Sequence, residues 1–573
     1  MSARHLAIGL DGADLALLES LGPSTLPNLH ALMHRGSYAA LQSVQPPATL
    51  PNWTTFLTGE NPGRHGVFDF TTRSGYSVRF TAGSVRQSPT IAARLDRLGK
   101  TCACLFFPAT YPPEQLDRGV FISGWDAPVA FEADPTFVWP RTLHADITRR
   151  FGPMRFDDVD EFDSDRPGFH DQLADRLKQR IERRIRICQW LLQVRTWDLF
   201  AVYFGESDTA AHHLWALHDP NSPRRPAHVS SAQESGLRRV YQALDRAVGQ
   251  LVASAGGRSV EVTIASDHGF GGASDKVVYL NRALSEAGLL AFHPSGSLVR
   301  ALGRKAVQHA KETALTRFPQ RLREQLFRAS GAKLPSALES QARYGAIDMQ
   351  RTQAFSDELN YFPAVHLNVR GREPEGIVDP SDVAKVTEAV RTALLSLRDP
   401  WTGMPVVSKV MRREDIYRGP CTNQAPDLVL ELALDGGYSY NLMPSWNAPK
   451  GSGAFRQLSS DEFLGRKGRS LQGSHRSRGL WIAAGPQVRS SGQVDLTIAD
   501  ATATLLARMG ASLPEHADGQ VCSEVLTIPT REESRPPVPL PNVETLHDER
   551  SQPMQDSEQA RVAERLRRLG YIE

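Results

Sequence analysis

The stretch Val260-Glu-Val-Thr-Ile-Ala265 is largely apolar. It is followed directly by Ser266-Asp267-His268-Gly269, which contains a carboxylate and an imidazole. Its β-branched side chains and its short length predict a buried strand rather than a helix. Ionisable side chains directly after such a strand need partners or a metal ion, because burying an unpaired charge is costly. We therefore expect Asp267 and His268 to belong to a site at this end of a sheet.

Two earlier apolar runs end in the same way. The run from His5 to Leu10 leads into Asp11, and the run from Trp197 to Phe204 is followed by Asp208. Further strands are expected at 102–107, 364–369, 427–432 and 479–484, and helices at 168–194, 230–254 and 496–509. This alternation predicts an α/β fold with a mainly parallel sheet, and such sheets bind ligands beyond the carboxyl ends of their strands.

The chain has 573 residues, which at roughly 150 residues per domain allows several domain equivalents. We predict four parts: the first part of a catalytic core over 1–283, a helical cap or insertion over 284–344, the remainder of the core over 345–525, and a tail rich in Pro and charged residues over 526–573. The segment 284–344 is interpreted as a cap or insertion because it is basic, most of all over 300–323, has a helical pattern and lacks strand signals. The tail has the composition of a surface or disordered segment.

Composition excludes several classes of protein. Lys plus Arg is 66 against 64 for Asp plus Glu, and a net charge of +2 gives no global attraction to nucleic acid or anionic lipid. Five cysteines are too few for a disulfide scaffold. No run approaches the ~20 apolar residues of a membrane span, and the first apolar run is too short for a signal peptide. We expect a cytoplasmic protein with a small-molecule partner; the sequence leaves its oligomeric state open.

Three carboxylates and three imidazoles are candidate metal ligands: Asp11, Asp208, His212, Asp267, His268 and His475. Asp208 and His212 are four residues apart and would share one face of a helix, although the neighbouring His213 is a rival. A mixed oxygen and nitrogen set suits Zn²⁺ or Mn²⁺ better than Ca²⁺ or Mg²⁺. Six ligands divide naturally into two sites of three, each with an open position. We therefore expect two divalent metal ions, with Zn²⁺ preferred.

A candidate nucleophile, Thr49, lies in Pro46-Pro-Ala-Thr49-Leu-Pro-Asn-Trp53. The prolines restrict the backbone, and a helix expected to start at Thr54 would leave Thr49 near a helix N-terminus, where phosphate is favoured. Metal coordination would lower the pKa of the hydroxyl and activate it. Asn52 and Arg476 are weaker substrate-binding candidates. A helix cap or a turn explains Asn52 equally well, and a surface salt bridge is the default interpretation of Arg476.

In their order along the chain, Asp11, Ala-Thr49-Leu-Pro-Asn, Asp208-x-x-x-His212, Asp267-His268 and Gly-Ser-His475 resemble the alkaline phosphatase superfamily. The most similar branch is the type I phosphodiesterase/nucleotide pyrophosphatase group with its bacterial relatives described as predicted phosphohydrolases or phosphomutases. The run Thr58-Gly-Glu-Asn-Pro-Gly-Arg-His-Gly-Val67 also resembles the segment that follows the nucleophile there. The resemblance implies a three-layer α/β/α core.

The resemblance also implies roles for these residues. One metal ion would be held by Asp11, Thr49, Asp267 and His268, and the other by Asp208, His212 and His475. Thr49 would attack phosphorus in line to form a phosphothreonine that water then hydrolyses.

Two departures from related patterns narrow the expected activity. Sulfatases of the superfamily carry Cys or Ser at the nucleophile and Arg four residues later, where this chain has Thr49 and Trp53, which argues against sulfate esters. Animal nucleotide pyrophosphatases place an Asn shortly after the His-Gly segment, where this chain has Asp69 and Phe70, so a nucleotide substrate stays open. We expect a metal-dependent phosphoric ester hydrolase of phosphodiesterase or nucleotide pyrophosphatase type. The alternatives are a phosphomonoesterase or cofactor-independent phosphomutase, and a non-catalytic binding member of the fold.

Overall fold

The computed structural model describes residues 4–80, 85–124, 135–154, 164, 166–294, 333–449, 451–465, 471–527 and 538–540. Its centre is a nine-stranded sheet with the order β20-β2-β19-β9-β1-β8-β5-β6-β7. Five neighbouring strands run parallel: β9 (Glu261–Ala265), β1 (His5–Leu10), β8 (Leu199–Phe204), β5 (Cys102–Leu105) and β6 (Val120–Ile122). The outer strands are β19 (Arg478–Ala484), β2 (Ser37–Gln42), β20 (Gly492–Gln493) and β7 (Val138–Trp139). The predicted α/β class with a mainly parallel sheet is confirmed.

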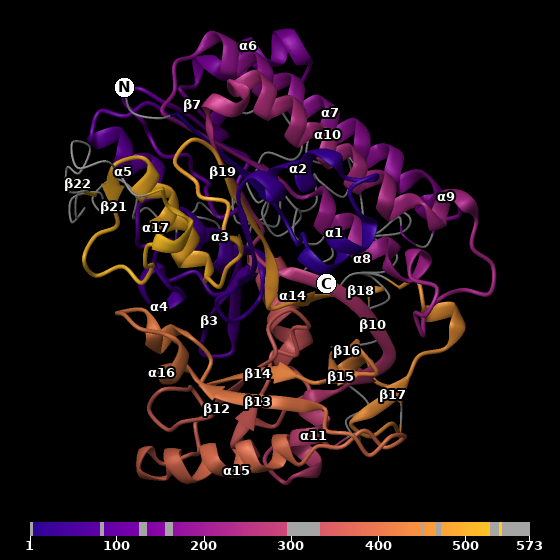
Figure 1. The fold of residues 1–573 in the computed structure, drawn as a ribbon. Coiled ribbons are helices and arrows are strands. Elements are labelled where there is room, and N and C mark those ends of the chain that lie inside the picture. Colours follow the sequence, from indigo (N-terminus) through magenta and orange to yellow (C-terminus); the bar gives the residue numbers. More distant parts are fainter. Residues whose placement is uncertain are drawn as a thin grey trace.

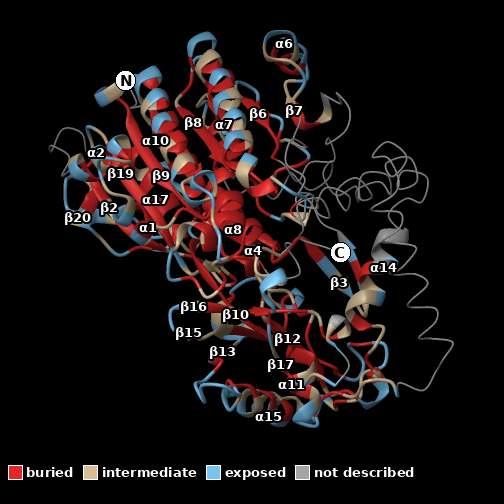
Figure 2. Ribbon diagram, turned by 90° about the vertical axis from the view of Figure 1, so that its right-hand side faces the viewer, coloured by how far each residue is buried: buried red, intermediate tan, exposed pale blue. Residues whose placement is uncertain are grey.

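Helices cover both faces of this sheet (Figure 1). One layer contains α1 (Leu15–Leu21), α2 (Pro27–Arg35), α7 (Phe169–Val194), α8 (Glu206–His218) and α10 (Gly236–Ala255), with α6 (Thr142–Phe151) and α9 (Ser231–Glu234) beside it. The other contains α3 (Thr49–Thr58), α5 (Ile91–Arg97) and α17 (Ile498–Arg508). The central strands β1, β8 and β9 are buried along their whole length (Figure 2). Burial on both faces explains why their sequences are continuously apolar.

A second group of strands forms separate sheets below the nine-stranded one (Figure 1). One has the order β15 (Leu434–Asp435), β16 (Tyr438–Leu442), β10 (Gly269–Val278), β17 (Phe455–Gln457), and the other β11 (Ala354–Phe355), β12 (Ala364–Leu367), β14 (Leu428–Leu432), β13 (Val407–Arg412). The helices here are α11 (Leu280–Glu286), α14 (Lys333–Tyr344), α15 (Val383–Leu395) and α16 (Arg413–Ile416). These elements enclose a second hydrophobic cluster that includes Leu284, Val365, Val390 and Leu428.

The strands predicted at 364–369 and 427–432 are therefore present but pair with each other and not with the nine-stranded sheet. The sequence predicted these strands within residues 345–525 without assigning their neighbours, because an apolar period identifies a strand but not the strand it pairs with. The four-part division as such stays a prediction. The basic segment 300–323 and all of the tail except 526–527 and 538–540 lie outside the described residues.

The helix that carries Thr49 begins five residues earlier than expected, at Thr49 itself. Pro51 is compatible with this start, because the first turn of a helix does not need its missing N–H group. After α3 the chain forms α4 (Pro62–His65) and the hairpin of β3 (Thr71–Ser74) and β4 (Ser77–Phe80). A further pair, β21 (Ala511–Ser512) and β22 (Val538–Pro539), lies near the end of the chain.

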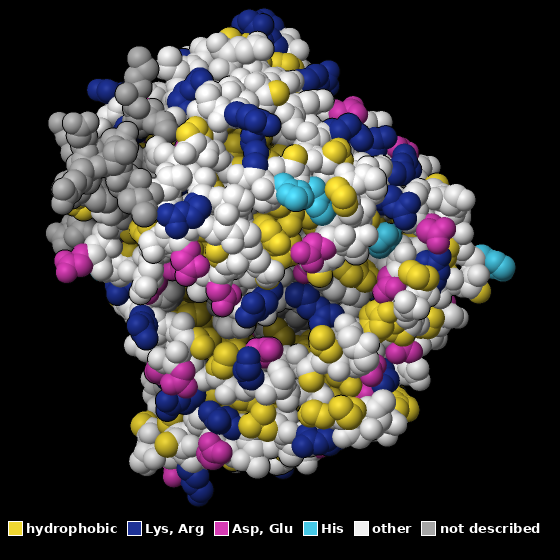
Figure 3. All heavy atoms as spheres, in the orientation of Figure 1, with side chains coloured by type: hydrophobic (Ala, Val, Ile, Leu, Met, Phe, Trp, Pro, Cys, Tyr) yellow, Lys and Arg dark blue, Asp and Glu magenta, His cyan; other side chains and the backbone are white. Residues whose placement is uncertain are grey.

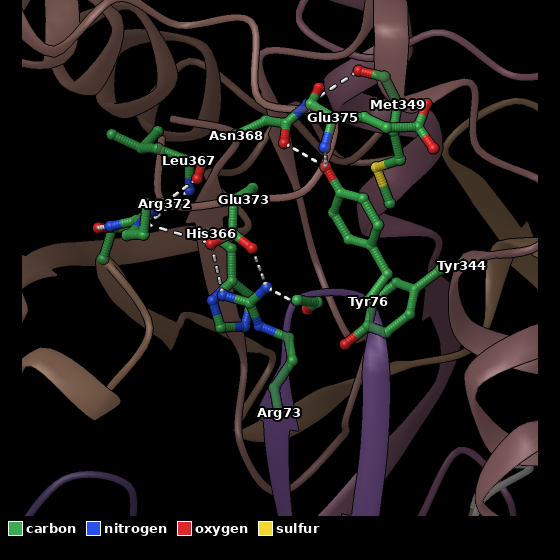
Figure 4. A network of polar contacts seen from close by, with 12 residues as sticks. Arg73, Tyr76, Tyr344, Met349, His366, Leu367, Asn368, Arg372, Glu373 and Glu375 are labelled. Carbon is green, nitrogen blue, oxygen red and sulfur yellow. Dashed lines mark hydrogen bonds and ion pairs between the residues drawn. The ribbon is translucent and has the colours of Figure 1, made fainter. Parts of the chain in front are cut away.

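The β3–β4 hairpin connects the segment after α3 and α4 to the second group of sheets (Figure 4). The Arg73 guanidinium donates to both carboxylate oxygens of Glu373, at 2.7 and 2.9 Å, and the Tyr76 hydroxyl donates to Asn368 Oδ1 at 2.6 Å. A cavity of about 370 Å³ lies here, and its walls include the ion pairs Arg73–Glu373 and Arg372–Asp427. Because these basic and acidic side chains pair with one another, the walls of the cavity are neither predominantly positive nor predominantly negative.

Basic and acidic side chains are interspersed on the face shown in Figure 3. This agrees with the net charge of +2. Among the helices in the described ranges, none combines the length and the apolar character that a membrane-spanning segment requires.

Buried His65 makes the stability of the protein depend on pH. Burial lowers the pKa of His65 from 6.5 to about 3, and the charge of Arg86 acts in the same direction. The unfolded chain therefore binds a proton below pH 6.5 that the folded chain does not bind, so stability is complete above pH 6.5 and falls as the pH falls toward 3. Between pH 7 and pH 5 this imidazole alone should cost about 2 kcal/mol of unfolding free energy.

We expect the H65Q variant to lose about 2 kcal/mol less than the wild type when the pH changes from 7 to 5. Gln can replace the two neutral contacts of the ring, which accepts from the Val67 N–H group and contacts Thr55 Oγ1, each at 3.1 Å. Urea unfolding at the two pH values measures the difference. Equal losses in both proteins would show that His65 is not held neutral.

Candidate active site

The candidate ligands lie at the carboxyl ends of three adjacent parallel strands. Asp11 follows β1, and Asp267 and His268 occupy the turn between β9 and β10. Asp208 and His212 lie one turn apart in α8, which follows β8. Because β9, β1 and β8 are neighbours in the sheet, their carboxyl ends bring these side chains to one place.

His475 reaches the site from a different element. It lies on β18 (Gly473–Arg476), a short strand outside the nine-stranded sheet that pairs antiparallel with β10 and places His475 opposite Phe270. The sequence had indicated a position just before β19. The pairing with β10 explains how a residue far along the chain lies beside His268, with the two rings stacked at a centroid distance of 3.7 Å.

The first set of ligand atoms comes from Asp11, Asp267 and His268, all buried and within 4.8 Å of one another. His268 Nε2 lies 3.2 Å from Asp267 Oδ2 and 3.5 Å from Asp11 Oδ1. The other oxygen of Asp267 accepts a hydrogen bond from the Gly12 N–H group at 3.0 Å. Each carboxylate therefore turns one oxygen toward the same point.

The second set is formed by Asp208, His212 and His475. Asp208 Oδ1 lies 3.3 Å from the Nε2 atoms of both histidines, and these two nitrogens are 3.0 Å apart. Ligand atoms of Asp208, His268 and His475 also lie within 4.8 Å of one another. Since His268 belongs to both groups of neighbouring atoms, the two sets adjoin.

All three imidazoles present Nε2 to the site. Their Nδ1 atoms lie 3.0, 3.1 and 2.9 Å from the backbone carbonyl oxygens of Gly269, Gly473 and Pro47, for His268, His212 and His475 in that order. A carbonyl oxygen only accepts, so each Nδ1 carries the proton and each Nε2 presents a lone pair. Backbone anchoring of the second nitrogen is typical of metal-binding histidines.

The buried carboxylates and imidazole lone pairs of the site would be stabilised by bound cations. Burial raises the pKa of Asp267 well above its usual range, and the negative charge of Asp11 raises it further. Burial lowers the pKa of His268, and the nearby His475 adds to this effect. The lone pairs of His212 and His475 face each other at 3.0 Å, an unfavourable contact unless a cation lies between them. The donor set thus fits divalent metal ions in two adjoining positions.

Thr49 is the first residue of α3 and is buried, and its hydroxyl makes no hydrogen bond to any described residue. Two residues before it, the Pro47 carbonyl accepts from His475, which belongs to the second set. One turn after it, the Trp53 indole N–H donates to Asp11 Oδ2 at 3.1 Å, in the first set. The residues around Thr49 therefore contact both sets.

The two weaker candidates have structural partners. Asn52 is fully buried, and its amide binds the loop before the helix through Val44 N, Pro46 O and Ala48 O at 2.8, 2.8 and 2.9 Å. Arg476 donates to the Gly437 carbonyl at 2.7 Å. These contacts favour structural roles, and substrate binding by Asn52 and Arg476 stays a prediction.

His213, the rival of His212, lies beside α7. Its ring contacts Phe169 and His170 at centroid distances of 5.5 and 6.4 Å. His212 is the member of the pair that meets Asp208.

Sequence reasoning missed the residues that bind Asp11. The Tyr203 hydroxyl and the Trp53 indole both donate to Asp11 Oδ2, and Ser207 Oγ donates to the Asp11 carbonyl at 2.6 Å. The one available signal was that Trp53 follows Thr49 by four residues, which places both on one side of a helix.

Comparison with known families shows that the chain is a phosphoric ester hydrolase. The family model for type I phosphodiesterase / nucleotide pyrophosphatase matches residues 5–468, and the chain belongs to this family. Members of this family are in general metal-dependent enzymes. A comparison with curated proteins found no match to the sequence.

Solved structures of ectonucleotide pyrophosphatase / phosphodiesterase 5 are similar in fold. The murine protein, as an inactive form in complex with AMP, is 12% identical with a TM-score of 0.46 over 90% of this chain and 97% of its own. The human protein is 12% identical with a TM-score of 0.45 over the same shares.

Proposed function

We propose that this hydrolase cleaves phosphodiester or pyrophosphate bonds with Thr49 as its nucleophile and with two divalent metal ions, preferably Zn²⁺. The first ion would be held by Asp11, Thr49, Asp267 and His268. The second would be held by Asp208, His212 and His475. The observation that supports this most is the meeting of the His212 and His475 Nε2 atoms at 3.0 Å beside Asp208 Oδ1, next to a second set of carboxylates.

The reaction begins with a phosphate group at the N-terminus of α3, where the helix dipole favours negative charge. Thr49 Oγ1 attacks phosphorus in line, a new P–O bond forms, and the bond to the leaving group breaks. The leaving group departs with the electron pair of the broken bond, and the hydroxyl proton of Thr49 balances the negative charge that this leaves on the departing oxygen. Water then attacks the phosphothreonine, which releases the phosphate product and restores the hydroxyl group. Bound divalent ions would lower the pKa of the hydroxyl group and offset charge on the phosphoryl oxygens.

The chain itself contributes fixed geometry. Each imidazole is held by a backbone carbonyl, and Thr49 is only 1% exposed, so the nucleophile cannot be hydrated freely. A buried hydroxyl without a hydrogen-bonding partner among the described residues is ready to bind an ion or a phosphoryl group. These features favour preorganisation, which reduces the reorganisation needed in the transition state.

Metal removal tests the proposal. We expect about two metal ions per chain, and we expect a chelator to reduce the turnover of bis(p-nitrophenyl) phosphate on the order of 10³-fold, with recovery on addition of Zn²⁺ or Mn²⁺. The melting temperature should fall when the ions are removed and rise again when they are added back. Full turnover by the metal-free protein would reject the two-metal site.

The same assay separates the candidate activities. A higher kcat/KM for bis(p-nitrophenyl) phosphate or a dinucleotide pyrophosphate than for p-nitrophenyl phosphate supports the diesterase. The reverse order would indicate the phosphomonoesterase, and isomerisation of a phosphosugar without release of phosphate would indicate the phosphomutase.

A further inference from the structure

Asp11 is bound by two neutral donors that come from different elements of the core. Trp53 Nε1 donates to Asp11 Oδ2 at 3.1 Å from α3, and the Tyr203 hydroxyl donates to the same oxygen at 2.6 Å from β8. All three side chains are buried, at 1% exposure for Asp11, 0% for Trp53 and 2% for Tyr203. Oδ2 is thus engaged twice, while Oδ1 lies 3.5 Å from His268 Nε2.

The surrounding residues make room for this arrangement. The indole of Trp53 packs edge-on against Phe107 and Tyr203, with ring centroids 5.3 and 5.5 Å away. A Cβ atom at Gly9 would lie 2.7 Å from the Trp53 ring, and one at Gly205 would lie 2.7 Å from the Tyr203 hydroxyl. Any larger residue at either position would push a donor away from Asp11, so these two glycines are part of the arrangement.

We propose that Trp53 and Tyr203 are positioning residues that hold Asp11 so that only Oδ1 binds the first metal ion. This inference rests on the proposed function and extends it to residues that do not touch the ion. Two neutral donors fix the carboxylate without cancelling its charge, whereas a cation in the same place would weaken its attraction for metal. Because Trp53 is one turn from Thr49, the same contact also sets the distance between the helix of the nucleophile and Asp11.

The test is W53F, which keeps an aromatic ring and removes the N–H donor, together with Y203F, which removes the O–H donor. The matched control is W481F, because Trp481 is equally buried in β19 and its indole N–H has no hydrogen-bonding partner among the described residues. Zn²⁺ affinity is measured by competition with a chromophoric chelator. The melting temperature of each metal-free protein reports on packing.

We expect W53F and Y203F each to weaken the binding of one of the two Zn²⁺ ions by roughly tenfold or more, and the double variant to weaken it further. Activity at low Zn²⁺ should fall and should recover largely at high Zn²⁺, while W481F binds Zn²⁺ as the wild type does. The metal-free W53F and W481F proteins should melt at similar temperatures.

The inference is overturned if W53F and Y203F bind both ions as tightly as W481F does. It is also overturned if their weaker binding simply follows a loss of stability in the metal-free state. If the wild-type protein binds two ions, each of these two outcomes for the variants would reject the inference and leave the proposed function intact. A wild-type protein that binds no Zn²⁺ would reject the proposed function itself.

Discussion

The T49A variant should lose the turnover of bis(p-nitrophenyl) phosphate on the order of 10³-fold or more, while it keeps its fold and the metal ion proposed to lie at Asp208, His212 and His475. The substitution removes the only atom proposed to bond to phosphorus. Thr49 is at the start of α3, and its hydroxyl makes no hydrogen bond to a described residue, so its loss should cost little stability. Steady-state kinetics, metal content and the melting temperature measure the three quantities.

Thr54 provides a matched control on the same helix. It is also buried, but its hydroxyl donates to the Leu50 carbonyl at 2.7 Å, within the helix. T54A should therefore keep most of the turnover, and T49S, which retains a hydroxyl group, should recover part of what T49A loses. If T49A kept more than roughly a tenth of the wild-type kcat, a residue other than Thr49 would be the nucleophile.

The second large effect is expected for H212Q. Gln cannot supply the imidazole nitrogen that meets Asp208 and His475, so the number of bound Zn²⁺ ions should fall from about two to about one. Turnover should fall by roughly 10² to 10³-fold, because one of two ions that share the charge of the transition state is lost.

The control for H212Q is H213Q, the same substitution at the next residue. His213 packs against Phe169 and His170, so its replacement should lower the melting temperature without changing the metal count. If H213Q lost an ion and H212Q kept both, His213 would be the metal ligand and His212 would not.

Much of the nine-stranded sheet could be predicted from the sequence. The strands β1, β8 and β9 are covered on both faces, so each is a continuous apolar run that ends in a polar residue. The strands β12 and β14 could be predicted as strands, but the sheet to which they belong could not, since an apolar pattern does not identify the neighbour of a strand. The start of α3 was placed too late, because Pro51 was taken as a sign of irregular backbone.

The candidate ligands could be named because Asp and His are unusual next to buried strands. Their contacts could not be predicted in the same way. The placement of His475 depends on the pairing of β18 with β10, and the interpretation of His212 over His213 depends on which face of α8 meets Asp208. The two hydrogen bonds to Asp11 Oδ2 come from Trp53 on α3 and Tyr203 on β8. Neither residue type indicates a metal site by itself.

The sequence by itself determined the α/β class, the strands that end in carboxylates and the residue types that suit a two-metal phosphoesterase, because these depend on local patterns of burial and charge. Only the tertiary structure decided which nitrogen of each imidazole faces the site, which oxygen of Asp11 is engaged, and that residues on either side of Thr49 contact both sets. Apart from the contact of His268 with the neighbouring Gly269 carbonyl, those features arise from contacts between residues tens to hundreds of positions apart. No local pattern in the chain encodes the direction of a side chain across such a separation.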